Sequence, residues 1–189
     1  MKQLKQTLIK NLSVQARFLP EFSPVYTELE LSSSDCFEYA GVIIRGRVDR
    51  VDVNSAQGQF VVIDYKGSVS GHDAGFDPDK NDSFVLPYKI QSLIYAQVLK
   101  QKLPERPVGA LYFNYRAQEN AHSVAGSYDD AFLNLSGFAR SASSVKLNFN
   151  QYLSLVEEEV SKRLEDTKAG IIEQKPLCNE SCKYCPVTT

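Results

Sequence analysis

Two aspartates and a lysine lie near the ends of two adjacent apolar segments, and their types and spacing suit them to chemistry. Asp49 lies within GVIIRGRVDRVDV, and Asp64 and Lys66 close the segment QFVVIDYK. Val and Ile dominate both segments and the polar stretch NSAQG separates them, which predicts a β-hairpin over residues 41–66. Carboxylates bind hard cations such as Mg²⁺, which completes its ligand shell with water and phosphate oxygens. The simpler interpretation, a hydrated rim of charges, leaves Asp49 unpaired inside a strand, which is costly.

Side chains alternate between the two faces of a strand, so the hairpin register decides whether the two aspartates meet. If Val53 faces Phe60, the same register places Asp49 opposite Asp64. Two further pairs follow from it, Val51 with Val62 and Arg47 with Lys66. Opposed residues lie ~4.5–5.5 Å apart at Cβ, and two carboxylates at that distance destabilise a sheet. We therefore expect a compensating cation here, either Lys66 or a divalent metal.

Three arginines, Arg45, Arg47 and Arg50, lie close to Asp49 in the sequence and can form an electropositive rim that binds phosphates. Cross-strand pairing with nearby acids is the alternative that the sequence leaves open. The whole chain has a net charge of −2, so it lacks the overall basic character of many nucleic-acid-binding domains. Glu28 is a further candidate ligand, although an exposed strand glutamate is the simpler explanation.

The 189 residues are 43% hydrophobic and 23% charged, which is typical of a globular domain with a real core. We expect a single domain over residues 1–189, in which residues 170–189 form a cysteine-containing tail. No apolar run approaches the ~20 residues of a membrane span, and the start shows no targeting pattern, so we expect no membrane association and a cytoplasmic location. The absence of a GxxxxGK[ST] phosphate loop argues against ATP hydrolysis.

Apolar spacing predicts a helix over residues 2–18, and alternation predicts a strand over 25–31 with one hydrated face. The helix is expected to carry its apolar positions on one face: Leu4, Leu8, Ile9, Leu12 and Val14. A buried strand is expected over 108–115 and a long helix over 147–168, with the glutamates at 157–159 pointing to solvent. Residues 129–144 show only a weak pattern.

A second helix is expected from Phe84, capped by Asp82 or Ser83, with Pro87 in its first turn. Its buried stripe is expected to comprise Leu86, Ile90, Leu93, Ile94 and Gln97.

Within this helix Gln91 and Tyr95 are four residues apart, so both can point at the same neighbour. The two histidines lie in predicted loops, His72 after the hairpin and His122 in a loop or edge strand over 118–127. A histidine in an exposed loop is more often neither a metal ligand nor a base.

The C-terminal tail contains three closely spaced cysteines, Cys178, Cys182 and Cys185. In a chain of cytosolic composition such spacing favours a metal or iron–sulfur site over disulfides. Iron–sulfur clusters and structural zinc use four ligands, so a fourth must come from Cys36, from another residue or from chain outside this sequence. A frayed tail without metal is the alternative.

The ordered combination of GRVDRVD, IDYK and a helix with Gln-x-x-x-Tyr resembles the PD-(D/E)XK nuclease superfamily over about residues 25–115. Within it, the chain is most similar to the RecB/AddB-type C-terminal nuclease domains of bacterial helicase–nucleases. The resemblance implies an α/β fold with a restriction-endonuclease-like core, in which helices flank a central mixed β-sheet.

The resemblance also implies roles for individual residues. Asp49 and Asp64 would bind Mg²⁺ or Mn²⁺, with the backbone carbonyl of Tyr65 as a further ligand. Lys66 would position or activate the attacking water. The helix residues that would support the site are Gln91 and Tyr95.

A DNA exonuclease acting in double-strand-break repair or recombination is the implied function, with DNA and a helicase domain or subunit as partners. In this group a [4Fe–4S] cluster pins the tail to an upstream cysteine, but the usual C-x2-C-x5-C ending is incomplete here. We therefore expect an excised domain of a longer protein, with the cluster incomplete in this segment. Two alternatives remain open: a non-catalytic DNA-binding or scaffold domain on the same fold, and a restriction-type endonuclease.

Overall fold

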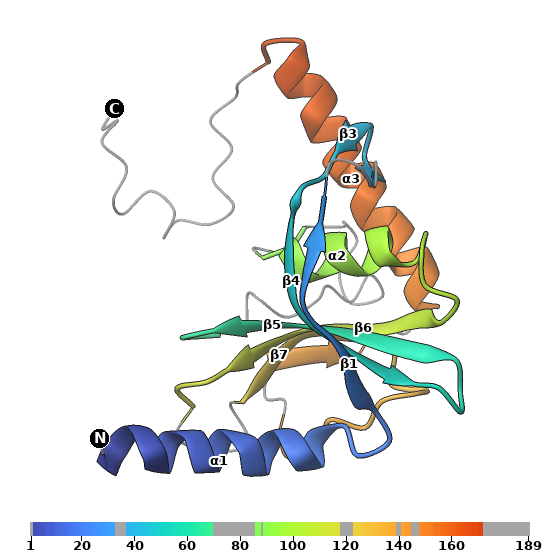
Figure 1. The fold of residues 1–189 in the computed structure, drawn as a ribbon. Coiled ribbons are helices and arrows are strands. Elements are labelled where there is room, and N and C mark those ends of the chain that lie inside the picture. The colour runs from blue at the N-terminus through green and yellow to red at the C-terminus, as the bar shows by residue number, and fades with distance from the viewer. Residues whose placement is uncertain are drawn as a thin grey trace, which may run out of the picture.

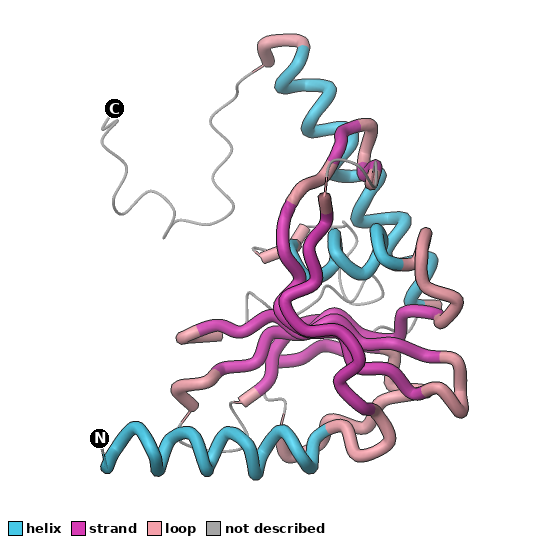
Figure 2. Tube along the Cα trace, in the orientation of Figure 1, coloured by secondary structure: helices cyan, strands magenta, loops and turns pink. Residues whose placement is uncertain are grey.

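The computed structural model describes residues 2–32, 37–69, 86–87, 89–117, 123–138, 141–144 and 148–171. Within them a six-stranded mixed sheet lies between one helix on one face and two helices on the other (Figures 1 and 2). The predicted α/β fold, a central mixed sheet flanked by helices, is confirmed. None of the helices in this described part is both long and apolar enough to cross a membrane.

The helices are α1 (Lys2–Phe18), α2 (Gln91–Leu99) and α3 (Phe149–Lys168). In spatial order the sheet contains β1 (Ser23–Leu31), β4 (Gly46–Asn54), β5 (Gln59–Lys66), β6 (Arg106–Asn114), β7 (Val124–Tyr128) and β8 (Ser141–Ser144). The pairs β5–β6 and β7–β8 are parallel, and the other neighbours are antiparallel. A separate two-stranded hairpin consists of β2 (Glu38–Tyr39) and β3 (Val42–Ile43).

Strand β5 is buried on both faces, and its alternation divides the core in two. Phe60 and Val62 pack on the side of α2 and α3, whereas Val61 and Ile63 pack on the side of α1. Because side chains alternate along a strand, Asp64 continues the row of Phe60 and Val62. The face that carries α2 therefore also receives this aspartate.

The predicted first strand of the hairpin is two strands in the structure. Ala40 and Gly41 have φ angles of 52° and 72°, and they form the tight turn between β2 and β3. Consecutive residues with positive φ are typical of two-residue hairpin turns. Residues 42–43 therefore pair with β2 in a separate hairpin, and β4 begins only at Gly46. The turn between β4 and β5 occurs where it was predicted, over residues 55–58.

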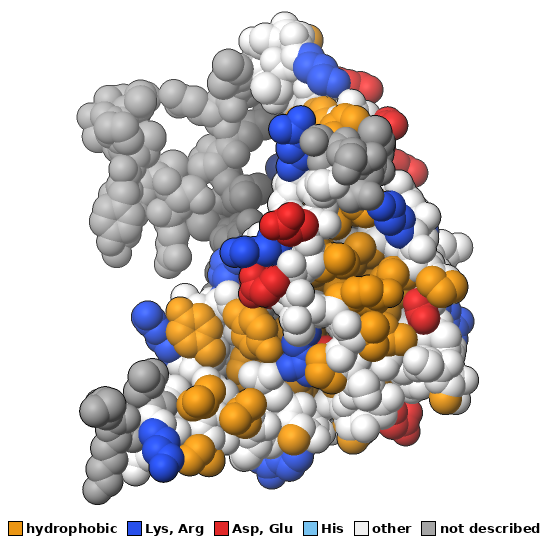
Figure 3. Space-filling view, in the orientation of Figure 1, with side chains coloured by type: hydrophobic (Ala, Val, Ile, Leu, Met, Phe, Trp, Pro, Cys, Tyr) orange, Lys and Arg blue, Asp and Glu red, His pale blue; other side chains and the backbone are white. Residues whose placement is uncertain are grey.

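The buried face of α1 differs from the predicted one. Val14 and Phe18 are buried, but Leu8, Ile9 and Leu12 are 56–57% exposed. In this half of the helix polar side chains make the contacts: Lys10 donates to the carbonyl of Ala117 and Asn11 to that of Tyr115. Apolar side chains consequently remain exposed along α1 (Figure 3).

Helix α2 starts later than predicted, at Gln91 instead of near Phe84. Leu86, which precedes Pro87, is not helical, because a proline disfavours helical geometry at the residue before it. The predicted capping residues, Asp82 and Ser83, lie outside the described residues.

Two further predictions need correction. Strand β7 lies between β6 and β8, so the segment predicted as a loop or edge strand is an inner strand in its described part. In α3 the glutamates do not all point to solvent, since Glu157 accepts hydrogen bonds from the backbone N–H of Ala40 and the amide of Gln97. Glu157 thus joins α3 to α2 and to the β2–β3 hairpin.

Candidate active site

The β4–β5 hairpin brings the two predicted aspartates to the same end of the sheet. Its register is the predicted one, with Val51 opposite Val62, and the ladder ends one pair before Asp49 and Asp64. At that point the backbone N–H of Tyr65 donates to Oδ2 of Asp49 over 2.8 Å. The Asp49 carboxylate therefore takes the place of a backbone hydrogen-bond acceptor and is fixed beside β5.

Beyond this point the two strands separate, so the predicted pairing of Arg47 with Lys66 is wrong. Arg47 pairs with Glu30 of β1, and Lys66 pairs with Asn114 of β6. The Arg47 side chain forms an exposed ion pair with Glu28 at 2.9 Å. Glu28 is thus an exposed strand glutamate, as the simpler explanation had it.

Asp64 is only 3% exposed, and its Oδ2 lies 2.7 Å from Nζ of Lys66. Burial raises the pKa of Asp64, because the charged carboxylate loses its hydration. The positive charge of Lys66 lowers this pKa, the negative charge of Asp49 raises it, and the charge of Lys89 lowers it, with a net shift upward. Asp64 thus holds a negative charge at an energetic cost that a further cation would offset.

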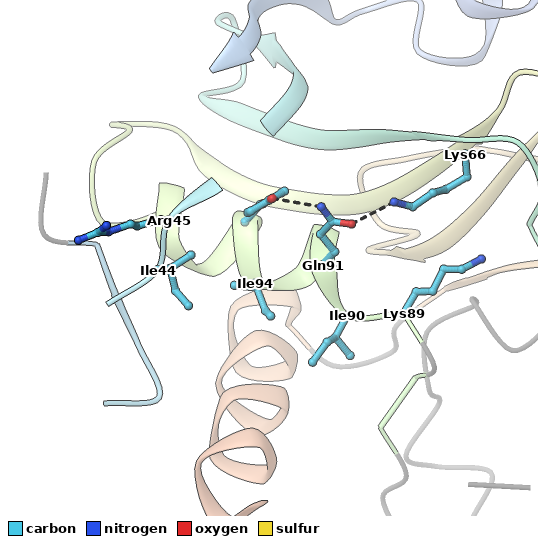
Figure 4. A pocket seen from close by; sticks show the side chains of 8 residues that line it. Ile44, Arg45, Lys66, Lys89, Ile90, Gln91 and Ile94 are labelled. Atoms are coloured by element: carbon cyan, nitrogen blue, oxygen red, sulfur yellow. Dashed lines mark hydrogen bonds between the residues drawn. The ribbon is translucent and has the colours of Figure 1, made fainter. Parts of the chain in front are cut away.

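A chain of hydrogen bonds connects Lys66 to α2. Nζ of Lys66 donates to Oε1 of Gln91 over 3.0 Å, and Nε2 of Gln91 donates to the hydroxyl of Tyr95 over 3.1 Å (Figure 4). Gln91 and Tyr95 lie one helical turn apart, which is what allows one amide to contact both partners. The structure therefore brings together Asp64, Lys66, Gln91 and Tyr95.

Gly46, which begins β4, is a part of this arrangement that the sequence analysis missed. A Cβ atom on Gly46 would lie 2.8 Å from the hydroxyl oxygen of Tyr95, closer than real Cβ contacts come. Only glycine allows the strand to approach Tyr95 this closely. Gly46 lies inside the strand that the sequence predicted, GVIIRGRVDRVDV, and a glycine there often marks such a close approach, so the signal was present in the sequence.

Arg50 is separated from the aspartates by its position on the opposite face of the sheet. Its guanidinium pairs with both oxygens of Asp52 and also donates to Gln15 of α1 and to the Tyr65 hydroxyl. The Arg50 and Asp52 side chains are 12% and 1% exposed. Arg50 therefore joins α1 to the sheet, and its engagement there takes it out of the expected electropositive rim.

A cavity of about 520 Å³ lies beside Lys66 and Gln91. Three isoleucines and two further cationic residues contribute to its lining: Ile44, Ile90, Ile94, Arg45 and Lys89. Figure 4 shows Arg45 at one end of the row of isoleucines and Lys66 and Lys89 at the other. Of the three predicted arginines, Arg45 is the one that borders this cavity.

The carboxylates present are suited to a hard divalent cation. Asp49 and Asp64 act electrostatically on each other, and Mg²⁺ commonly uses one or two carboxylates together with water and substrate oxygens. Among the described residues no group of three or more Asp, Glu, His and Cys side chains could hold a metal ion. Any third protein ligand in this part of the chain would have to be of another kind, such as the predicted carbonyl of Tyr65.

Several predicted residues lie outside the described part of the chain. They are His72, His122 and the four cysteines Cys36, Cys178, Cys182 and Cys185. The iron–sulfur prediction therefore stays a prediction.

The fold and the site together define a class, an α/β domain with two acids and a lysine at the end of a mixed sheet. The family model of the PD-(D/E)XK nuclease superfamily matches residues 2–189, and the chain belongs to this superfamily. No curated protein matches the chain significantly. Members of the superfamily are nucleases that generally use divalent metals.

Proposed function

We propose that this chain is a Mg²⁺- or Mn²⁺-dependent deoxyribonuclease, with Asp49, Asp64 and Lys66 as its central residues. The observation that carries the proposal is the cluster in which the buried carboxylate of Asp64 lies 2.7 Å from the Lys66 ammonium, with Asp49 beside it. A buried acid, a second acid and a lysine held by a helix amide provide charges suited to hydrolysis of a phosphodiester.

Asp49 and Asp64 would hold the metal ion, with the Tyr65 carbonyl as a further ligand. When bound, the metal supplies Lewis acidity toward the phosphate and a more acidic water. Lys66 presents a compact positive charge next to the attacking water and the phosphate oxygens. Gln91 accepts a hydrogen bond from Lys66 and so orients its ammonium group, while Tyr95 fixes the Gln91 amide.

The finer proposal is an exonuclease of the RecB/AddB type that works with a helicase domain or subunit in double-strand-break repair or recombination. Its support is the ordered series GRVDR, IDYK and Gln-x-x-x-Tyr. On this proposal residues 1–189 form one nuclease domain, and the cysteines of the tail contribute to a [4Fe–4S] cluster in the full-length protein.

The experiment is digestion of end-labelled linear DNA and of circular DNA with Mg²⁺ or Mn²⁺. We expect the wild type to degrade linear DNA, and Asp64→Ala and Lys66→Ala to lose activity by about 10²–10³-fold, as when one charge-stabilising group is removed from an active site. Asp166→Ala and Lys162→Ala, exposed residues of α3, are the matched controls and should keep full activity. Equal activity of wild type and Asp64→Ala would refute the assignment.

The remaining outcomes identify the alternatives. Cleavage of circular DNA at defined positions would indicate a restriction-type endonuclease. Tight DNA binding with weak Mg²⁺ binding by calorimetry and no cleavage would indicate a non-catalytic scaffold domain.

A further inference from the structure

The cavity beside the candidate active site has an apolar wall. Ile44, Ile90 and Ile94 are each half-buried and pack against the core with part of their surface. They come from two places, since Ile44 follows β3, whereas Ile90 is the N-cap residue of α2 and Ile94 lies one turn further along that helix. Two segments thus present three aliphatic side chains to one space of about 520 Å³.

Cationic side chains border this apolar wall at both ends. Arg45 lies beyond Ile44, and Lys89 and Lys66 lie at the end where the predicted catalytic groups are (Figure 4). The charge of Lys89 also acts on Asp64, which places Lys89 within electrostatic reach of the acid. The cavity therefore combines cationic side chains, which attract phosphates, with an aliphatic wall, which does not bind them.

This combination fits an unpaired nucleotide better than a paired one. A duplex presents hydrated phosphates and sugars on its outside and keeps the faces of its bases stacked inside. Aliphatic side chains gain little from contact with a phosphate, but an unstacked base offers a large, weakly hydrated face. Proteins that bind single strands commonly combine contacts to the base faces, mostly from aromatic side chains, with a positively charged groove.

We propose that this cavity holds the base of one unpaired nucleotide next to the phosphodiester that is cut, packed on Ile44, Ile90 and Ile94. Arg45 and Lys89 contact the phosphates on either side of that nucleotide. The proposal rests on the nuclease function proposed above and assigns its preferred substrate form, a strand unpaired at the cleavage site. The contact is with the face of the base, so it favours no particular sequence.

The test uses a single-stranded oligodeoxythymidine in which one position at a time is abasic. We expect one abasic position to lower cleavage at its adjacent phosphodiester by about tenfold in the wild type, the effect of losing a buried apolar contact. Ile44→Ala should lower cleavage of the intact strand by a similar factor. This variant should then cleave the intact strand and the abasic strand at the same rate. Ile43→Ala is the matched control, because Ile43 is the preceding residue, is 55% exposed and does not line the cavity.

Fluorescence anisotropy of the same labelled strands, with Ca²⁺ in place of Mg²⁺, measures binding independently of cleavage. The wild type should bind the intact strand more tightly than the abasic one, and Ile44→Ala should bind both alike. Additive effects of Ile44→Ala and the abasic position, or equal cleavage of paired and unpaired strands, would overturn the subsite while leaving the nuclease intact. A wild type that binds with the predicted difference but cuts no DNA with Mg²⁺ or Mn²⁺ would overturn the nuclease and support the subsite.

Discussion

Asp64 combines deep burial with a charge, and the two requirements conflict. Burial and the neighbouring Asp49 raise its pKa, and the nearby lysines do not fully compensate in the metal-free protein. Burial of the charged carboxylate costs free energy when the protein folds. A bound cation offsets this cost, and such an acid therefore suits a cation-binding site. On the proposed function, burial of Asp64 lowers the stability of the metal-free fold and raises its affinity for the metal ion.

Asp64→Asn should therefore raise the melting temperature of the metal-free protein near neutral pH while abolishing cleavage. The folded-state pKa of Asp64 lies above its unfolded value, so its favourable contribution is complete below an unfolded pKa of about 3.9 and is lost as the pH rises through the folded pKa. The increase in melting temperature caused by Asp64→Asn should accordingly become smaller as the pH falls. Thermal unfolding over a pH series measures this, with Asp166→Asn as a control that should change little.

Added Mg²⁺ or Mn²⁺ provides the second half of this test. Ligand at ten times its dissociation constant stabilises a protein by about 1.4 kcal/mol, so the ion should raise the melting temperature of the wild type but not of Asp64→Asn. A variant that is less stable than the wild type at neutral pH without metal would contradict this account of Asp64.

Gly46 affects the site through the space it leaves for Tyr95. Gly46→Ala should push the Tyr95 hydroxyl away and so disturb the hydrogen bonds that connect it through Gln91 to Lys66. We expect cleavage to fall by about 10–100-fold, the effect typical of outer-shell partners at metal sites, with a small change in melting temperature. Steady-state kinetics should show the loss mainly in kcat.

A double variant identifies the cause of that loss. If the methyl group acts through the Tyr95 hydroxyl, Tyr95→Phe should cost much less in the Gly46→Ala background than in the wild type. Independent, additive losses would show that Gly46 and Tyr95 act separately.

At the scale of elements, the sequence predicted the strands and their register better than the helix surfaces. The β4–β5 register follows from alternation and the length of the turn, both of which are local, and the pairs as far as Arg50 and Ile63 match. Beyond that pair β4 stays paired with β1 and β5 stays paired with β6, while β4 and β5 no longer pair with each other. These outer neighbours come from distant parts of the sequence, and local patterns carry no information on them.

The face of α1 was mispredicted for a related reason. Leu8, Ile9 and Leu12 have helical spacing, but the turn that follows β6 lies beside that half of the helix and offers carbonyls that bind Lys10 and Asn11. Periodicity identifies an apolar stripe and cannot reveal which part of the helix the sheet reaches. The aspartates, Lys66, Gln91 and Tyr95 were predicted because their motifs are local. Gly46, Lys89 and the isoleucines of the cavity required the packing of two segments that are distant in the sequence.

The attachment of α1 to the sheet depends on the pair of Arg50 and Asp52. Arg50→Ala leaves the Asp52 carboxylate, 1% exposed, without its partner, and removal of one member of a buried pair costs about 3–5 kcal/mol. Arg47→Ala on the same strand should cost about 0–1 kcal/mol, because its pair with Glu28 is exposed. Chemical denaturation measures both values.

The combined variant Arg50→Met with Asp52→Leu tests whether the cost arises from the unpaired charge. It should recover most of the stability, since apolar residues of similar size can replace a buried ion pair. A loss as large as that of Arg50→Ala would instead indicate that the hydrogen bonds to Gln15 and Tyr65 dominate.

For the whole molecule, a net charge of −2 excludes a general attraction to DNA, so binding must depend on a few local cations. On the proposed subsite these are Arg45, Lys66 and Lys89. Each phosphate contact to a single strand contributes a slope of about −0.7 to the plot of log binding constant against log salt concentration. Three contacts predict a slope of about −2, much shallower than that of basic DNA-binding domains.

Lys89→Ala should reduce this slope by about 0.7 and weaken binding of every sequence alike, because phosphate contacts carry no sequence information. Lys162→Ala, whose side chain is 72% exposed on α3, should leave the slope unchanged. The measurement is fluorescence anisotropy of a labelled single strand with Ca²⁺ over a range of KCl concentrations. A slope steeper than about −4, or one that Lys89→Ala leaves unaltered, would mean that DNA contacts the protein mainly elsewhere, outside the cavity beside Lys66.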